Sequence, residues 1–244
     1  MKKILALTSI CMLIVLFGCT IPSGETVTVS YPVENNYYRL YISDGIQVTV
    51  TDEVDEIVVT GDESVIAKLS VESTSSTLKI YRRDVSLVYL TPTEVLLPYN
   101  ELLREVEASM DSEFYTPYGL ESENVKITLN SRSRFDGYIN ANTLNLHMDD
   151  SKADLEGYAP NLILKLNDGA ELEQHWAGNY FSFECDVCTG TMNSSTAYFH
   201  CYDEISVDMY NGSLIYYTSD YENIVDFSGV DGTSDVVYCG GTKK

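Results

Sequence analysis

The chain has 244 residues, 37 acidic against 15 basic side chains, and a formal net charge of −22 at pH 7. Because so acidic a protein repels phosphate backbones and anionic lipid, we expect no nucleic-acid partner and no membrane contact except through an attached lipid. Divalent cations, cationic partners and neutral glycans are compatible with this charge. The 19 tyrosines, the many β-branched residues and the six prolines favour strands over helices.

The first residues have the pattern of a bacterial lipoprotein signal peptide. Lys2 and Lys3 precede a short apolar run that ends in Leu16-Phe17-Gly18-Cys19. The run is too short to cross a bilayer comfortably. We therefore predict a signal peptide over residues 1–18 and acylation of Cys19. The lipid would anchor the protein to the outer membrane, facing either the periplasm or the cell surface. An ordinary secretory signal and an uncleaved anchor are the alternatives.

Residues 19–26 are predicted to form a tether, since they include Pro22, Ser23 and Gly24. Residues 27–98 follow as an N-terminal β section, in which short runs of alternating apolar residues are separated by polar or glycine-containing turns. The predicted strands cover residues 27–31, 38–42, 46–50, 57–59, 68–71 and 78–81.

Residues 99–244 repeat with a period near twenty. Similar segments start at Val125, Leu144, Leu162, Phe181, Ile205 and Ile224. Such a period without a helix is typical of turns that stack and bury one another's inward side chains. We predict an all-β fold, a parallel β-solenoid of right-handed β-helix type that continues the N-terminal section. Its inward positions are expected at Ile127, Leu146, Leu164, Phe183, Val207 and either Val225 or Asp226.

An earlier turn of the same kind is predicted through Val106-Glu107-Ala108-Ser109 and ends at Phe114. The overlapping segment from Glu101 to Ala108 has a pattern that also fits a helix. Local periodicity leaves these two possibilities open.

Three features in sequence order indicate a known family. The first is the pattern Ile42-Ser43-Asp44-Gly45-Ile46, which leads through Gly61-Asp62 to Leu78-Lys79-Ile80. The second is Leu97-Pro98, and the third is the closing segment Val237-Tyr238-Cys239-Gly240. Together they resemble the auto-transporter adhesins with a head GIN domain, common among exported Bacteroidetes proteins. The resemblance covers Tyr38 to Gly240 and implies a parallel β-solenoid and an adhesion-like role. It implies no catalytic residues. The corners of the turns depart from the family's Ser-Gly-x-Ser pattern.

Four cysteines follow Cys19, namely Cys185, Cys188, Cys201 and Cys239, and an exported protein permits any of their three pairings. Cys185 and Cys188 have the spacing of a redox motif, but they lie on a predicted strand, not at a helix N-terminus. His200 and Cys201 would complete a zinc set, although adjacent residues of a strand point to opposite faces. We expect a disulfide or buried thiols, and no metal or cofactor.

Polar residues recur at one predicted corner of the stack. Alignment of the turns places Asn130, Asp149, Asn167 and Asp186 there, about 4.8 Å apart from one turn to the next. Because amides separate the carboxylates, we expect a solvated ladder. A calcium site is the alternative, with oxygen ligands from Asp149, Asp150, Asp168 and Asp186.

Tyrosines of the C-terminal turns are the candidate binding residues. Since Tyr216 and Tyr217 are adjacent on a strand, one of them should face outward. An outward aromatic stripe can stack on sugar rings or form a protein interface, whereas the alternative is that these rings only cover the edge of the core. The candidates are Tyr198, Tyr202, Tyr210, Tyr216, Tyr217 and Tyr221.

The sequence gives little support for catalysis. The three histidines, His147, His175 and His200, are scattered, and carboxylates are too common for one acid–base pair to stand out. We therefore predict a non-catalytic, lipid-anchored envelope protein that presents a solenoid surface to a glycan or to another envelope protein. The alternatives are a polysaccharide-active enzyme of β-helix type and a structural or sensor component of the envelope.

Overall fold

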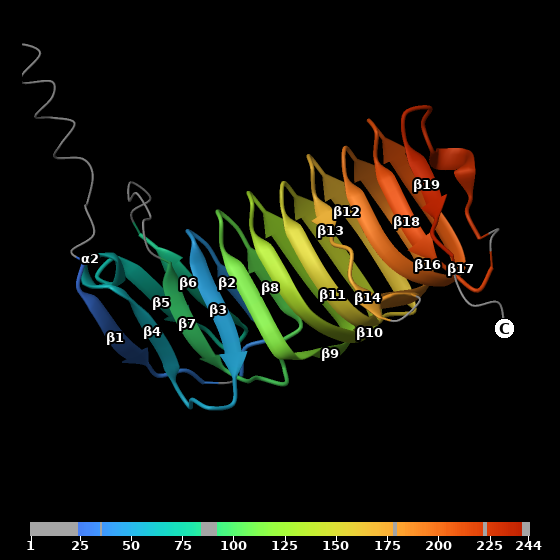
Figure 1. The fold of residues 1–244 in the computed structure, drawn as a ribbon. Helices are drawn as coiled ribbons and strands as arrows, with labels where there is room; N and C mark the ends of the chain where they lie inside the picture. Colours follow the sequence, from blue (N-terminus) through green and yellow to red (C-terminus); the bar gives the residue numbers. More distant parts are fainter. Residues whose placement is uncertain (1–23, 35, 84–91, 178–179, 222–223, 241–244) are drawn as a thin grey trace, which may run out of the picture.

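The computed structural model describes residues 24–34, 36–83, 92–177, 180–221 and 224–240, so the predicted signal peptide, Cys19 and most of the tether lie outside it. The fold is all-β, as predicted, and its strands follow one another along an elongated stack (Figure 1). Helix is limited to the single turn α2 (Glu63–Ile66) and the 3-10 turn η1 (Phe227–Gly229) within the described residues. Neither of these two is long or apolar enough to span a membrane.

Six strands of the N-terminal section confirm the predicted ones to within a few residues. Two features were not predicted: strand β7 (Thr93–Pro98), and helix α2, which Asp62 caps by accepting a hydrogen bond from the backbone N–H of Ser64. The confirmed strands are β1 (Thr26–Tyr31), β2 (Arg39–Ile42), β3 (Ile46–Thr51), β4 (Ile57–Asp62), β5 (Leu69–Ser73) and β6 (Thr77–Arg82).

Four of the remaining strands run for 11 to 18 residues and bend around the stack. The segment predicted as either turn or helix is strand β8 (Glu105–Ala108). It is followed by β9 (Glu113–Asn130), β10 (Arg134–Asp149), β11 (Lys152–Tyr158), β12 (Asn161–Asn167), β13 (Glu171–Leu172), β14 (Trp176–Ala177), β15 (Tyr180–Phe181), β16 (Phe183–Asn193), β17 (Thr196–Tyr210), β18 (Leu214–Thr218) and β19 (Asp235–Tyr238).

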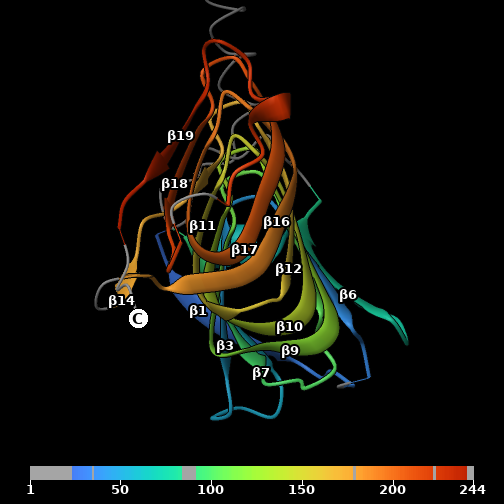
Figure 2. The same cartoon turned by 90° about the vertical axis from the view of Figure 1, so that its right-hand side faces the viewer.

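Parallel pairing joins most of the strands in two rows, whereas β1 with β4, β4 with β7, β5 with β6 and β14 with β15 pair antiparallel. Along the first row, the residues in register are Gln47, Glu113, Arg134, Lys152, Glu171, Thr196, Leu214 and Asp235. Along the second row they are Leu40, Val106, Ile127, Leu146, Leu164, Gly190 and Val207. Viewed along the stack, the two rows meet in a narrow edge on one side and curve into each other on the other (Figure 2).

The predicted register is right for most of the repeats and wrong at two places. Phe183 is buried, but it pairs with Gly157, and Gly190 occupies the predicted position of Phe183 beside Leu164. The spacing is longer here because the antiparallel hairpin of β14 and β15 is inserted between β13 and β16. In the last turn Val225 pairs with Ile205 instead of Val207, and Asp226 is exposed.

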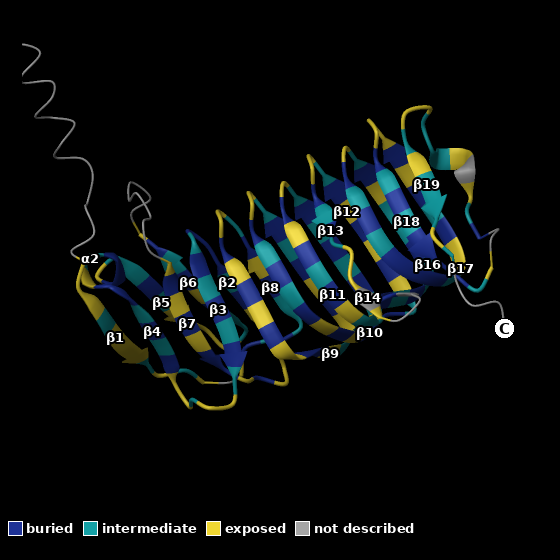
Figure 3. Cartoon of the chain, in the orientation of Figure 1, coloured by how far each residue is buried: buried dark blue, intermediate teal, exposed yellow. Residues whose placement is uncertain are grey.

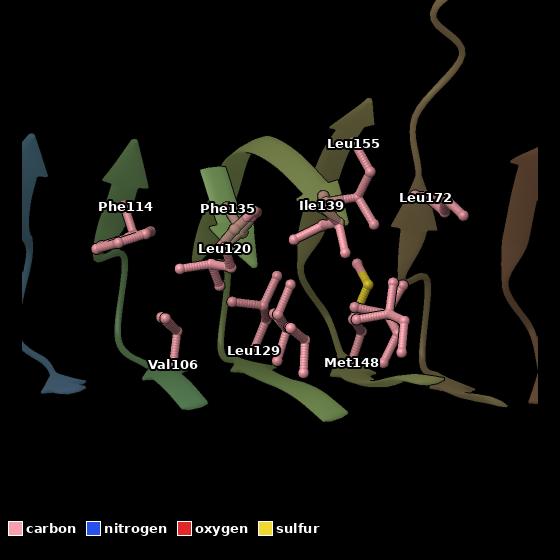
Figure 4. Close-up of a cluster of buried hydrophobic side chains, with 14 of the residues drawn as sticks. Val106, Phe114, Leu120, Leu129, Phe135, Ile139, Met148, Leu155 and Leu172 are labelled. Atoms are coloured by element: carbon pink, nitrogen blue, oxygen red, sulfur yellow. The ribbon is translucent and has the colours of Figure 1, made fainter. Parts of the chain in front are cut away.

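One hydrophobic core runs through both the N-terminal strands and the repeats. Alternate residues along each strand are buried, which gives the banded pattern of Figure 3. Within the core, side chains from successive turns pack on one another, as Phe114 does on Phe135 with ring centroids 5.4 Å apart (Figure 4). Burial of such side chains stabilises the fold by about 1.5–3 kcal/mol each.

The narrow edge is built from left-handed residues followed by small ones. Asp150, Asp168, Ser194 and Asn211 have φ between 43° and 55°. Asp and Asn tolerate this conformation better than most residues because their side chains bond to nearby backbone. Behind them, serine hydroxyls bond to backbone carbonyls, as Ser151 does to Leu129 at 3.1 Å. The serines at this edge, each exposed by 3% or less, are Ser112, Ser133, Ser151, Ser195 and Ser213.

Candidate binding site

The predicted binding tyrosines do not form one stripe. Tyr198 and Tyr216 are half-buried neighbours on the first row, and their rings stack 4.8 Å apart at 8°. Tyr217 points into the core and is 2% exposed. Tyr210 lies at the narrow edge, at the other end of β17 from Tyr198, and Tyr221 follows β18. The structure therefore brings together two of these six side chains.

The sixth tyrosine, Tyr202, lies on the curved side of the stack. Its hydroxyl donates a hydrogen bond of 2.6 Å to Glu184. The contact joins β17 to β16, which carry these two residues. Tyr202 thus supports a carboxylate and is not part of the aromatic pair.

The predicted acidic corner is correct for three of its four aspartates. Asp149, Asp150 and Asp168 lie at the narrow edge, where Asp149 pairs with Asn130 and Asn167. Asp186 does not, because Asn193 takes that place in the ladder and Asp186 lies on the curved side. Among the described residues, no group of three or more His, Cys, Asp or Glu side chains is arranged to hold a metal ion.

The four cysteines of the described part of the chain are free thiols. Cys185, Cys188 and Cys201 are buried, and Cys239 is exposed. Burial raises the pKa of Cys185 and of Cys188 well above the ordinary value, which opposes the thiolate that redox chemistry needs. A hydrogen bond from Cys185 lowers the pKa of Cys201. Cys185 and Cys201 lie in register on adjacent strands.

A cavity of about 470 Å³ opens on the curved side, where the inserted hairpin leaves the stack. Figure 2 shows β14 projecting from the stack. Strands β10, β11 and β16 form the floor, and His175 and Ala177 of the hairpin segment form one wall. The lining residues are Tyr138, Glu156, Gly157, Tyr158, His175, Ala177, Ser182 and Glu184.

Gly157 is required at the floor of this cavity. Its φ is +105°, and a Cβ at this position would lie 2.1 Å from the carbonyl oxygen of Ile139 and 2.9 Å from the Tyr138 ring. The backbone can therefore pass directly beside Tyr138. Ser182 fixes the hairpin, because its N–H donates to the carbonyl of His175 at 2.9 Å and its hydroxyl donates to that of Leu155 at 3.0 Å.

The polar groups of the cavity are mostly carboxylates and phenols. The Tyr158 hydroxyl donates to the Asp186 carboxylate at 2.8 Å. Burial first, and then this hydrogen bond, raise the pKa of Tyr158 to about 12. Tyr138 is 42% exposed. The site therefore offers aromatic faces beside hydrogen-bond acceptors that are held in place.

A charged network adjoins the cavity on the first row. Arg134 contacts Glu173 at 2.5 Å and Asp154 at 3.7 Å, and Lys152 contacts Glu171 at 2.9 Å. His175 lies between Asp154 and Glu156, with nitrogen–oxygen distances of 3.2 and 3.5 Å. These contacts order the side chains next to the cavity. As exposed pairs they stabilise the fold by only about 0–1 kcal/mol each.

Sequence reasoning missed this cavity because its lining comes from three repeats and the insertion. Glu156 and Tyr158 sit in β11, Tyr138 in β10 and Glu184 in β16. The sequence nevertheless contains a signal of the insertion. Asn193-Ser194-Ser195 repeats the Asn–Ser type of corner seen at Asn130-Ser131, which marks Asn193 as the corner that follows Asn167 and makes this turn longer than the others.

Residues 36–220 match the family described as putative auto-transporter adhesin, head GIN domain. The chain belongs to this family. The resemblance predicted from the sequence is thereby confirmed, and the match covers the strands from β2 to β18. No curated protein matches the sequence.

Solved structures share the fold of this head GIN domain protein at low sequence identity. A putative adhesin from Bacteroides fragilis NCTC 9343 has a TM-score of 0.72 and 13% identity, covering 90% of this chain and 95% of its own. A putative adhesin from Parabacteroides merdae ATCC 43184 has a TM-score of 0.62 and 16% identity, covering 92% of this chain and 98% of its own. A putative lipid binding protein from Parabacteroides distasonis ATCC 8503 has a TM-score of 0.61 and 14% identity, covering 91% of this chain and 98% of its own.

Proposed function

We propose that this protein is a non-catalytic, lipid-anchored binding protein of the cell envelope, and that it holds a glycan in the cavity beside the hairpin. The observation that carries the proposal is the lining of that cavity, where the rings of Tyr138 and Tyr158 adjoin the carboxylates of Glu156 and Glu184. Aromatic faces stack on the apolar faces of sugars, and fixed carboxylates accept hydrogen bonds from sugar hydroxyls. Its volume lies in the range of small-molecule sites, about 300–1,000 Å³.

The family supports an adhesion-like role, since its description and two of the similar structures name adhesins and no enzyme. We also infer that the stacked repeats form a right-handed β-solenoid. The parallel register, which advances by 17 to 26 residues from Asn130 to Tyr210, supports this inference.

Binding to an immobilised glycan array, with the protein starting at Thr20, tests the proposed ligand. We expect binding to selected glycans and its loss in Tyr138→Ala. The matched control is Tyr115→Ala, because Tyr115 is 45% exposed and does not line the cavity. Binding that survives Tyr138→Ala, or that Tyr115→Ala abolishes equally, would move the site elsewhere.

A polysaccharide-active enzyme is the second candidate, because two carboxylates, Glu156 and Glu184, line one cavity as such enzymes require. Incubation with the glycans that bind, followed by an assay for new reducing ends, separates the two functions. If the protein only binds the glycans, no new reducing ends are released. Release that both Glu156→Gln and Glu184→Gln abolish would establish the enzyme instead.

Lipid anchoring depends on Cys19 in this proposal. Cys19→Ala is expected to move the protein from the membrane fraction to the soluble fraction and to abolish labelling with a fatty-acid analogue. A Cys19→Ala protein that stays acylated and membrane-bound would contradict the lipoprotein interpretation.

A further inference from the structure

Among the described residues that line the cavity beside the hairpin, carboxylates outnumber side chains that can carry a positive charge. Glu156 and Glu184 both line it, and the carboxylate of Asp186 lies behind Tyr158. None of the described residues that line the cavity is a lysine or an arginine. His175 is the one lining residue that can carry a positive charge, and its ring already contacts Asp154 and Glu156.

The basic side chains nearest along the same strands are committed to other carboxylates. Arg134 contacts Glu173 and Asp154, and Lys152 contacts Glu171 and Glu173. Glu184 receives a hydrogen bond from the hydroxyl of Tyr202, which is neutral. Among the described residues, Glu184 is therefore hydrogen-bonded but has no ion pair, and Glu156 contacts the His175 ring at 3.5 Å, so a cationic ligand can supply the balancing charge.

We propose that the cavity binds a glycan that carries a protonated amine, that is, an amino sugar without an N-acetyl group. This inference rests on the proposed function and adds to it the chemical class of the sugar. The ammonium group would lie between Glu156 and Glu184, and the sugar ring against Tyr138.

Three features of the cavity favour this class over the others. A neutral sugar leaves Glu184 without a counter-charge and Glu156 with the His175 ring alone, whereas an ammonium group makes charge-assisted hydrogen bonds with both carboxylates. The exposed face of Tyr138 attracts a cation as well as the apolar face of a sugar. A volume of about 470 Å³ exceeds what an ammonium group alone fills and leaves room for a ring.

Titration calorimetry with matched oligosaccharides tests the inference. The probes are tetramers of glucosamine, N-acetylglucosamine and glucose, which share a β-1,4 backbone and differ at one substituent. At pH 6 and physiological salt we expect the glucosamine tetramer to bind about tenfold or more tightly than the other two. A tetramer of lysine serves as a cationic probe without a sugar ring.

Two charge variants separate the cavity from the general acidity of the protein. Glu156→Gln is expected to weaken binding of the glucosamine tetramer about tenfold. Glu123→Gln removes the same charge from an exposed position of β9 outside the cavity, and is expected to change binding less than twofold. Circular dichroism of both variants confirms that the fold is retained.

Each alternative outcome overturns a defined part of the proposal. Equal affinity for all three oligosaccharides, lost in Tyr138→Ala, would keep the glycan site and overturn its preference for an amine. Tetralysine binding as tight as glucosamine binding would replace the sugar with a basic peptide. Equal weakening by Glu156→Gln and Glu123→Gln would show attraction to the whole surface and overturn the site. Absence of glucosamine binding overturns the inference, whereas the glycan array tests the proposed function separately.

Discussion

Tyr198 stacks face to face on Tyr216, with ring centroids 4.8 Å apart and ring planes at 8°. The separation equals the spacing of neighbouring strands, so the two rings stack because their residues are in register on β17 and β18. The buried Phe181 ring forms an edge-to-face pair with Tyr198, with ring centroids 5.7 Å apart. The pair therefore links the hairpin insertion to the last turns of the stack.

The stacked pair is expected to stabilise these turns cooperatively. A double-mutant cycle with Tyr198→Ala and Tyr216→Ala should give a coupling energy of about 0.5–1.5 kcal/mol in urea unfolding. The cycle of Tyr198→Ala with Tyr210→Ala is the control, since Tyr210 lies at the other end of β17. Equal coupling in both cycles would contradict a specific contribution from stacking.

Leu164 tests the register of the stack. It is 1% exposed, so Leu164→Asp buries a carboxylate without a partner and should cost several kcal/mol or prevent folding. Its neighbour Ile163 is 40% exposed, and Ile163→Asp should change the free energy of unfolding by about 0.5 kcal/mol or less. Circular dichroism and thermal melting compare the two. Similar melting temperatures for both variants would show that the register is wrong.

Gly190 tests the close approach of two turns. A Cβ there would lie 1.9 Å from the carbonyl oxygen of Leu164, and φ is +131°. Gly190→Ala should therefore lower the free energy of unfolding by about 1–3 kcal/mol. A Cβ at Gly232 would meet no atom within 4 Å, so Gly232→Ala is the control and should have little effect. Urea titration measures both, and equal effects would contradict the close approach.

Tyr158 gives the candidate site a measurable pH dependence. Its pKa is raised to about 12, so the folded protein keeps the phenol proton after the unfolded chain, near pH 10, has lost it. The resulting contribution to stability is complete below pH 10 and is lost as the pH rises towards 12. Carbon-13 NMR of the labelled tyrosine Cζ follows this titration. Asp186→Asn should lower the pKa of Tyr158, whereas Asp168→Asn at the distant edge should leave it in place.

Thiol reactivity tests the burial of the cysteines. In reduced protein starting at Thr20, Ellman's reagent should react quickly with Cys239 alone and with Cys185, Cys188 and Cys201 only after unfolding. The fast phase should vanish in Cys239→Ser. A second fast thiol in the folded protein would show that one of the three is accessible.

Alternating patterns were sufficient to predict many of the strands and much of the core. Ile127, Leu146 and Leu164 are buried in register because their turns differ in length by only one residue. Where the spacing grows to 26 residues, between Asn167 and Asn193, the same pattern chose Phe183. Phe183 is apolar and buried, as a residue beside Leu164 would be. Its residue type therefore could not reveal that it lies on the curved side instead.

The candidate site was harder to predict than the fold. Glu156 and Glu184 are 28 residues apart in sequence and line one cavity because Tyr158, two residues after Glu156, pairs with Glu184 across the strands. Such an arrangement depends on the length of the insertion, which period-two patterns do not encode. The buried serines of the narrow edge could not be predicted from the sequence either, because serine is usually a surface residue. Ser133 and Ser151 are identified as internal by the backbone carbonyls to which their hydroxyls donate.

The hairpin of β14 and β15 pairs only with itself, whereas the strands before and after it belong to the continuous sheet. Apart from Phe181, which is buried against Tyr198, its residues can therefore diverge without disturbing the pairing of any other strand. Relatives built on the same stack can acquire new recognition properties by replacing this one segment. In protein engineering it is accordingly the natural place at which to graft foreign loops.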